Sequence, residues 1–306
     1  MQGHCRGVVA GIAVVLTSSV HAQSNSQAIS LRRMLSTVNA GDASGYAAVY
    51  SPEAVVTIYG GGELRGRAAI EQHEVELLKQ FPGTRLAFYD VWQDGARGVV
   101  HYAVNGQTPD GRAMGHEGLL FLQFDAAGLI VLERRYLDSV TPMAQLGIVR
   151  ASARSLPKLP SDLRLHIAGT SAQERKNLAM VRELLSNLSP DFLPHLADRP
   201  VIHEMMLPQS FAGAERVTAW RRIWHDAVPD ARVEVTGALA AGEFVLIETI
   251  LRGTLQQPIG VLRPAGKPFA AHRASIVHVQ ADKIAAVASF MNSKEIADAL
   301  GQWPPR

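Results

Sequence analysis

Side chains suited to a buried face recur with helical spacing at two places in the chain. The first set consists of Ile70, His73, Leu77 and Phe81. The second set begins 147 residues later and consists of Val217, Trp220, Trp224 and Val228. Intervals of three and four residues put each set on one side of a helix, so the pattern predicts two helices that each bury one face.

Strand-like segments follow the first of these helices in an unbroken series. They are Arg85–Trp92, Gly98–Asn105, Met114–Phe124 and Leu129–Asp138. The helix itself follows a helical pattern from Leu31 to Val38, a short helical segment at Tyr46–Tyr50 and an apolar strand at Ala54–Tyr59. Helices first and consecutive strands later predict an α+β domain, in which a curved antiparallel sheet wraps over the N-terminal helices.

The same order of segments occurs twice, which indicates an internal duplication. Four pairs of residues lie 147 positions apart: Gly66 and Gly213, Pro82 and Pro229, Gly95 and Gly242, Gly106 and Gly253. A repeat of this length is a whole domain and not a solenoid unit. We therefore expect one domain over residues 28–149 and a second over 173–303, joined by a linker at 150–172 that is rich in Pro and Ser. Whether Leu163–Ile167 adds a strand to either domain stays open.

The first residues of the chain resemble an export signal. Arg6 precedes an apolar run from Gly7 to Leu16, and Val20-His21-Ala22 fits a small-x-small cleavage site. The apolar run is shorter than the roughly 20 residues that a membrane span needs. We expect a signal peptide over residues 1–22, cleavage after Ala22, and a periplasmic or secreted protein.

Composition narrows the classes of partner and site. The only cysteine, Cys5, lies within the expected signal, so the mature chain has neither a disulfide nor a cysteine metal ligand. The net charge is +2, with no run of basic residues and no alternation of basic and aromatic residues, so nucleic acid is not an expected partner. His203-Glu204 lacks the second histidine of a zinc helix, since Leu207 occupies that place, and no phosphate-binding loop is present. We expect neither a metal nor a cofactor.

The two copies differ most informatively in their last strands, Ile130–Asp138 and Ile284–Asn292. On one face of this strand, Arg134, Tyr136 and Asp138 of the first copy are replaced in the second by Ala288, Phe290 and Asn292. All three changes remove a polar or charged group, and those from Tyr to Phe and from Asp to Asn do so at nearly constant shape, which predicts a working pocket in the first domain that the second has lost. The alternative is drift after duplication, with Arg134 and Asp138 as a surface ion pair.

Neighbouring strands supply further candidates for this pocket. His116 is expected beside Asp138, where the two could share a proton with a substrate near neutral pH; a histidine with one backbone hydrogen bond is the alternative. His116 and Glu117 point to opposite faces of their strand, so at most one of them lines the pocket. The residues in phase with His116, which include Leu120, Leu122 and Phe124, form an apolar set, and together with Tyr59 they are expected to contact the substrate.

Short motifs spread over both copies resemble the SnoaL-like branch of the nuclear-transport-factor-2-like (cystatin-like cone) superfamily. In the first copy they are Gly66-Arg-Ala-Ala-Ile70, Phe81-Pro82, Asp94-Gly95, Arg134-Arg-Tyr-Leu-Asp138 and Gln145-Leu146-Gly147. In the second they are Val201-Ile-His203-Glu204, Val228-Pro229-Asp230, Gly253-Thr254, Pro264-Ala-Gly266-Lys267 and Leu300-Gly301. The resemblance implies two tandem cone-shaped domains that pack sheet to sheet as a pseudo-dimer within one chain.

The resemblance also implies a role for the candidate residues. Asp138 is similar to the acid/base of polyketide cyclases and to one carboxylate of limonene-epoxide hydrolases. The Arg-x-Asp pattern of the hydrolases is absent, because Gly115-His116-Glu117 occupies the matching positions. The base and oxyanion acid of ketosteroid isomerases would fall near Ile58 and Leu120, both apolar, which argues against that chemistry.

We therefore hypothesise an exported enzyme that acts on a small apolar molecule by cofactor-free acid/base catalysis, of the cyclase, isomerase or epoxide/lactone hydrolase type. Asp138 would be the acid/base, Tyr136 an oxyanion donor, and Arg134 a pKa tuner or substrate clamp. The alternatives are a periplasmic binding protein that holds an apolar ligand unchanged, and a structural interaction module.

Overall fold

The computed structural model describes residues 26–186 and 192–303. The predicted signal peptide and its cleavage site lie outside these residues. The first domain opens with a helix over residues 26–40. It continues with α2 (Ala43–Ala47), β1 (Tyr50–Ile58), β2 (Gly62–Arg65), α3 (Arg67–Gln80), β3 (Arg85–Asp94), β4 (Arg97–Gln107), β5 (Ala113–Phe124), β6 (Ile130–Tyr136), α4 (Val140–Gln145) and β7 (Arg164–Ile167).

The second domain repeats this order. It consists of α5 (Ala172–Ser186), the short 3-10 helix η1 (Leu193–His195), β8 (Leu196–Glu204), β9 (Ser210–Ala212), α6 (Ala214–Ala227), β10 (Arg232–Ala241), β11 (Phe244–Thr254), β12 (Pro268–Gln280), β13 (Lys283–Met291) and α7 (Ser293–Leu300). Even irregularities recur: a bulge between Phe88 and Asp90 in β3 reappears between Val235 and Gly237 in β10. Both domains therefore share one backbone plan, as the duplication predicts.

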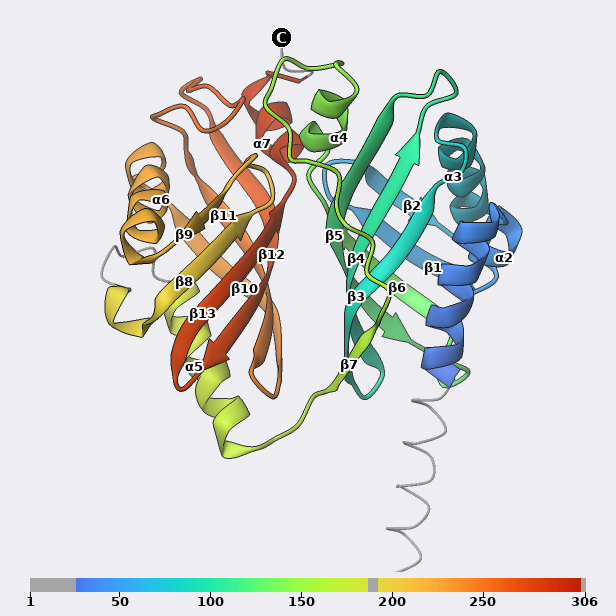
Figure 1. The fold of residues 1–306 in the computed structure, drawn as a ribbon, viewed down its shortest axis with the longest axis horizontal. Coiled ribbons are helices and arrows are strands. Elements are labelled where there is room, and N and C mark those ends of the chain that lie inside the picture. The colour runs from blue at the N-terminus through green and yellow to red at the C-terminus, as the bar shows by residue number, and fades with distance from the viewer. Residues whose placement is uncertain (1–25, 187–191, 304–306) are drawn as a thin grey trace, which may run out of the picture.

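The predicted fold class is confirmed: each domain is a curved sheet over helices (Figure 1). The sheet orders are β2-β1-β6-β5-β4-β3-β7 and β10-β11-β12-β13-β8-β9. Both sheets are mixed and not purely antiparallel, because β1 pairs in parallel with β6, and β8 with β13. The four strands predicted after α3 are present. The predicted short helix at Tyr46–Tyr50 lies earlier, at Ala43–Ala47, where the Asp42 side chain accepts a hydrogen bond from the Gly45 amide and caps it.

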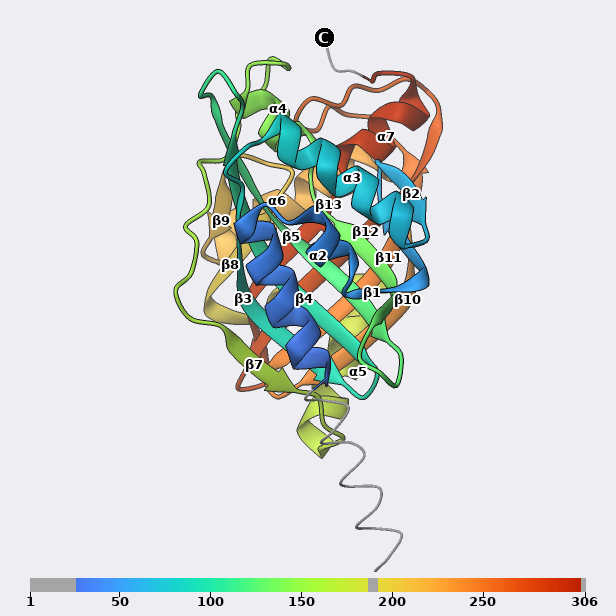
Figure 2. The same ribbon diagram turned by 90° about the vertical axis from the view of Figure 1, so that its right-hand side faces the viewer.

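The linker contributes a strand to the first domain, which answers the question that the sequence left open. β7 pairs in parallel with β3 at the edge of the first sheet (Figure 2). Arg164 Nη2 and His166 Nε2 both lie 2.7 Å from the carboxylate of Asp90. These contacts attach the linker, which leads on to the second domain, to the edge of the first sheet.

The two sheets face each other through the middle of the molecule (Figure 1). Helices α2 and α3 lie on the outer side of the first sheet and α6 on the outer side of the second, whereas α4 and α7 lie near the boundary between the domains. One buried apolar cluster draws its members from both sheets; they include Trp92, Leu119, Phe121, Tyr136, Leu246, Ala274, Ile276 and Phe290. Each sheet therefore buries both of its faces, one against its own helices and one against the other domain. Within the described residues, no helix has the length and apolar character of a membrane span.

Candidate functional site

The polar face of β6 that the sequence singled out lies between the domains and not in a pocket of the first. Arg134 forms a two-point ion pair with Glu248 of β11, with N–O distances of 2.6 and 2.7 Å. Tyr136 donates its hydroxyl to the same carboxylate at 2.7 Å. The prediction that Arg134 and Tyr136 line the first domain's pocket is therefore wrong, because β6 turns its other face toward the helices.

The second domain lacks the counterparts of Arg134 and Tyr136, and the residue that would pair with them differs as well. His101 in β4 occupies the position that corresponds to Glu248 in β11. Phe290, the counterpart of Tyr136, packs edge-on against His101 with 5.5 Å between ring centroids. A tyrosine thus meets a glutamate on one side of the pseudo-symmetric interface, and a phenylalanine meets a histidine on the other.

Asp138 is a helix cap and an interface residue. Its Oδ2 accepts hydrogen bonds from the Thr141 amide at 2.9 Å and the Thr141 hydroxyl at 3.0 Å, at the start of α4. Its Oδ1 accepts from the amide and hydroxyl of Ser293, in the second domain. The side chain is 2% exposed and borders only a void of about 20 Å³, so the expectation that it faces a substrate pocket is also wrong.

Tyr59, expected to contact the substrate, lies at the same interface. Its ring stacks on His272 of β12, with 4.0 Å between centroids, and lies 4.6 Å from the ring of Tyr136. His272 corresponds in the sheet register to Glu117 and not to His116, whose counterpart is Ala271. The interface therefore collects Arg134, Tyr136, Asp138 and Tyr59, the larger part of the predicted polar site.

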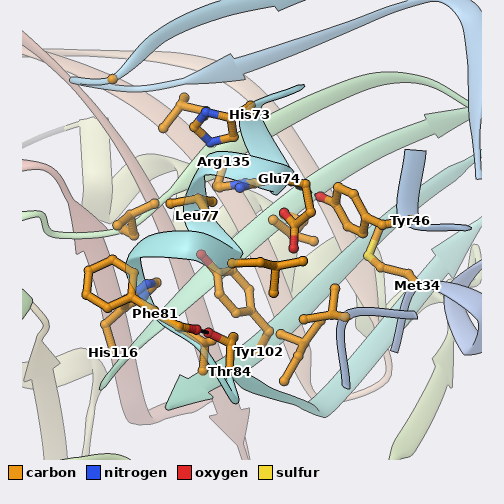
Figure 3. Close-up of a pocket in the computed structure, with 18 of the residues that line it drawn as sticks. Met34, Tyr46, His73, Glu74, Leu77, Phe81, Thr84, Tyr102, His116 and Arg135 are labelled. Carbon is orange, nitrogen blue, oxygen red and sulfur yellow. Dashed lines mark hydrogen bonds between the residues drawn. The ribbon is translucent and has the colours of Figure 1, made fainter. Parts of the chain in front are cut away.

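The substantial cavity inside the first domain lies between its sheet and α3, with a volume of about 280 Å³ (Figure 3). Most of its lining is apolar and includes Met34, Val38, Ile58, Leu77, Leu78, Phe81, Leu86, Val104, Met114, Leu120 and Leu137. Its polar lining comes from Tyr46, His73, Glu74, Thr84, Tyr102, His116 and Arg135. An apolar cavity with a few polar groups is the usual form of a small-molecule site.

Two of the predicted residues line this cavity, His116 and Leu120. Leu122 and Phe124 lie on the same inward face of β5 but are buried in the core beyond the cavity. Glu117 points the other way and pairs with His101 at 3.0 Å, so of these two neighbours it is His116 that faces the cavity. Burial lowers the pKa of His116 to about 4, which keeps its ring neutral at pH 7. His116 and Asp138 are not hydrogen-bonded to each other, and each has its own partners.

A closed polar network forms one wall of the cavity. Arg135 donates from Nε to Glu133 Oε1 at 2.7 Å and from Nη2 to the Tyr46 hydroxyl at 2.9 Å. Tyr50 donates to Glu133 Oε2 at 2.6 Å, and the hydroxyls of Tyr46 and Tyr50 lie 2.7 Å apart. Burial disfavours the charge on Arg135, but Glu133 and the surrounding tyrosines outweigh this and raise its pKa. Arg135 is thus a fixed cation at the cavity wall.

Glu74 and Tyr102 face the same cavity without a protein partner. Glu74 is 6% exposed and Tyr102 is 5% exposed, and neither side chain has a hydrogen bond within residues 26–186 and 192–303. Burial raises the pKa of the Glu74 carboxyl, and Arg135 lowers it in part. Burial likewise raises the pKa of Tyr102, so its hydroxyl keeps its proton. Figure 3 shows Glu74, Tyr102 and Arg135 directed into one cavity from α3, β4 and β6.

Sequence reasoning missed Glu74, Tyr102 and Arg135. A usable signal was present in α3, because Glu74 follows Ile70 by four residues and so lies on the apolar stripe. A charged residue on a buried stripe is uncommon unless it is paired or functional. Glu133 and Arg135 form a second signal, since residues two apart in a strand share a face.

The second domain is filled where the first is hollow. Trp220 and Trp224 occupy the positions in α6 that His73 and Leu77 occupy in α3, and both are 7% exposed. The void beside these tryptophans measures only about 20 Å³. In the described parts of the chain, no three His, Cys, Asp or Glu side chains gather in an arrangement that would hold a metal ion.

Comparison with known proteins agrees with this architecture. Residues 31–133 match the SnoaL-like domain model, and residues 176–300 match the SnoaL-like polyketide cyclase model. A search of curated protein sequences finds no match.

Solved structures align with one domain at a time. A protein from Jannaschia sp. CCS1 described as a SnoaL-like polyketide cyclase is 17% identical, over 44% of this chain and 99% of its own, with a TM-score of 0.40. A Catenulispora acidiphila protein with a ketosteroid isomerase-like fold, in complex with trimethylamine, is 17% identical over 43% and 95%, with a TM-score of 0.36. A Mycobacterium tuberculosis protein in complex with estradiol-17beta-hemisuccinate is 15% identical over 38% and 95%, with a TM-score of 0.35. On the two matching domain models, the chain belongs to the SnoaL-like family and consists of two such domains in tandem.

Proposed function

We propose that the first domain binds a small, largely apolar carbonyl compound in its cavity and that Glu74 transfers a proton to and from it. The observation that carries this proposal is that Glu74 and Tyr102, neither of which has a hydrogen bond among the described residues, face the same mainly apolar cavity. A buried carboxyl without a hydrogen bond destabilises a fold, so its presence here fits a group reserved for a ligand.

The geometry suits proton abstraction beside a carbonyl. The Glu74 carboxylate would take a proton from the α-carbon, and the electron pair of that C–H bond would move into the carbonyl to give an enolate. The Tyr102 hydroxyl would donate a hydrogen bond to the enolate oxygen, and the fixed charge of Arg135 would stabilise it. In a β,γ-unsaturated ketone, return of the proton to the γ-carbon completes an isomerisation. Alternatively, attack of the enolate on a second carbonyl forms a new C–C bond and closes a ring, and the protonated Glu74 gives its proton to the resulting alkoxide.

The pKa values fit this division of roles. A raised pKa brings the Glu74 carboxyl closer to the operating pH, where a general base works best. Tyr102, whose pKa is raised, stays a donor. His116, neutral above about pH 4, adds a polar contact without a charge. No cofactor is required for this chemistry.

The second domain would act as the structural partner in an intrachain pseudo-dimer. Its sheet covers the face of the first sheet that is turned away from α2 and α3, and Glu248 and Ser293 hold Arg134, Tyr136 and Asp138 in place. We also propose export to the periplasm or the medium, on the pattern of residues 1–22. N-terminal sequencing of the mature protein tests that step, and a mature chain that still begins at Met1 would contradict it.

Deuterium uptake tests the proton transfer. The probe is 2-tetralone, a small apolar ketone, incubated in deuterium oxide with the mature protein and followed by NMR. Wild type is expected to accelerate exchange at the α-carbon, and Glu74→Gln to abolish the acceleration. The matched control is Glu76→Gln, on the exposed side of the same helix, where the Glu76 side chain bonds Gln72 and Lys79. Loss of exchange in both variants, or in neither, contradicts the assignment of Glu74.

A binding measurement with the same probe, set beside the exchange rates, separates an enzyme from a carrier. Binding of 2-tetralone, measured by native mass spectrometry, without faster exchange would favour a protein that holds an apolar ligand unchanged. A Tyr102→Phe variant that binds normally but exchanges slowly would instead support the enzyme, because only the enolate needs the hydroxyl.

A further inference from the structure

The second domain retains a small void at the place that corresponds to the first domain's cavity. Its lining includes Trp220, Arg221, Trp224, Leu251 and Arg273, and its volume is about 20 Å³. The four polar members of this set are each at least nine-tenths buried. A void of this size holds a single particle about as large as a water molecule.

Three of the residues that line this void carry a hydrogen-bond donor without an acceptor. Trp220 Nε1, Trp224 Nε1 and Arg273 Nη2 are buried and have no partner among the described residues. An indole N–H and a guanidinium N–H can only donate. Of the side chains that line the void, only His225 has a nitrogen that can accept, and its Nδ1 pairs with Asp226 at 3.1 Å.

Arg273 also brings a buried positive charge to the void. Burial lowers the pKa of Arg273, and the nearby carboxyl of Glu204 partly offsets this effect. Among the described residues neither oxygen of Glu204 accepts a hydrogen bond, so Glu204 leaves the Arg273 Nη2 donor unsatisfied. A buried cation beside unpaired donors favours a negative charge next to it.

We propose that this void is a binding site for a monovalent anion of the size of chloride, held by the indole N–H groups of Trp220 and Trp224 and by Arg273. The anion would accept the three unpaired hydrogen bonds and offset the charge of Arg273. A water molecule fits the void as well, but it would leave the positive charge in place and would find few acceptors for its own protons.

Fluorescence quenching by bromide tests the site, because two of the proposed ligands are tryptophans. In wild type, sodium bromide replaces sodium gluconate at constant ionic strength, and quenching is expected to saturate as a single site fills. Collisional quenching of an exposed tryptophan rises linearly and does not saturate. Chloride should compete and restore emission, while gluconate, which is too large for the void, should not.

Variants assign the effect to these residues. Trp224→Phe removes one donor but keeps an aromatic ring, and should raise the half-saturating bromide concentration by about tenfold. Arg273→Gln removes a charge and should raise it further. Trp303→Phe is the matched control, since Trp303 packs on Lys294 away from the void, and should leave saturation unchanged.

The melting temperature tests the same site in wild-type protein, so this test does not require that any variant folds. Wild type should melt at a higher temperature in sodium chloride than in sodium gluconate of equal ionic strength, because an anion that binds only the folded state stabilises it. Equal melting temperatures together with linear bromide quenching would overturn the proposal and leave water as the occupant.

Discussion

Asp138 and Asn292 occupy equivalent positions in the two domains, and each forms hydrogen bonds across the domain boundary. Asp138 accepts from the amide and hydroxyl of Ser293. Asn292 accepts from the Ser139 amide at 3.2 Å and donates to the Ser139 hydroxyl at 2.9 Å. Each side chain also caps the helix that follows it, with Thr141 or Lys294 as the donor. The exchange of Asp for Asn thus keeps one negative charge where two aspartates would repel.

This arrangement predicts that Asp138→Asn weakens the fold and not the chemistry. All four groups bonded to the Asp138 carboxylate are donors, so an amide NH₂ in its place would face at least one of them. We expect the free energy of unfolding to fall by about 1–3 kcal/mol. Urea denaturation measures the loss.

The control for this prediction is ligand binding in the first-domain cavity, which should match wild type. If Asp138→Asn unfolds like wild type but loses proton transfer, Asp138 is the acid/base after all and the cap is incidental.

The α+β domains, the duplication and most strand positions could be predicted because they depend on local periodicity and turn residues. The sequence could not predict which face of β6 points toward the helices of its own domain. Arg134 and Tyr136 lie on one face and Glu133 and Arg135 on the other, and both faces are buried. Alternation along a strand identifies the inner face only when the opposite face meets water. Here the second domain replaces water, and its contacts join residues more than 100 positions apart in sequence.

The cavity could not be predicted either, because a cavity forms where side chains from different elements leave space between them, and the sequence alone does not show how those side chains pack. Comparison of the copies did hold a clue, since Leu77 in the first corresponds to Trp224 in the second. The larger side chain fills space that the smaller one leaves open. Glu74 corresponds to Arg221, so both copies place a charge at this point of the helix, and its sign differs.

Leu77→Trp should close the first-domain cavity. The second domain accommodates Trp224 at the equivalent position, so the backbone can accept this side chain, although overpacking costs about 1–3 kcal/mol. We expect binding of 2-tetralone, measured by native mass spectrometry, to weaken by at least about tenfold, which is about 1.4 kcal/mol. Leu77→Met, which nearly conserves volume, is the control and should bind like wild type. Unchanged binding in Leu77→Trp would mean that the ligand lies elsewhere.

Glu204 should make stability depend on pH. Burial raises its pKa to about 7, while Arg273 and Arg154 lower it and Asp138 raises it. The ordinary pKa of a glutamate is about 4.5, so the folded state binds the proton more tightly than the unfolded state. The resulting stabilisation is complete below about pH 4.5 and is lost as the pH rises through 7, by roughly 3 kcal/mol in all.

Urea denaturation between pH 5 and pH 8 measures this dependence. Glu204→Gln cannot titrate and should lose this part of the slope, whatever its absolute stability. Glu53→Gln, an exposed residue of β1, is the control and should keep the wild-type slope. A Glu204→Gln variant with the full wild-type slope would show that Glu204 is ionised in the folded protein throughout this range.

Glu74→Leu should stabilise the protein and abolish proton transfer. The leucine removes a buried carboxyl that lacks a hydrogen bond, and Arg135 keeps Glu133 as its ion-pair partner. We expect the free energy of unfolding to rise by about 1–3 kcal/mol. Because the raised pKa of Glu74 makes its ionised form the unfavourable one, this gain should be largest at pH 8 and shrink toward pH 4, where wild type is protonated. Glu76→Leu, on the exposed side of the same helix, should change stability by only about 0.5 kcal/mol. A Glu74→Leu variant less stable than wild type would instead show that the carboxylate supports the fold through Arg135, and Glu74 would then be a structural charge and not one held for a ligand.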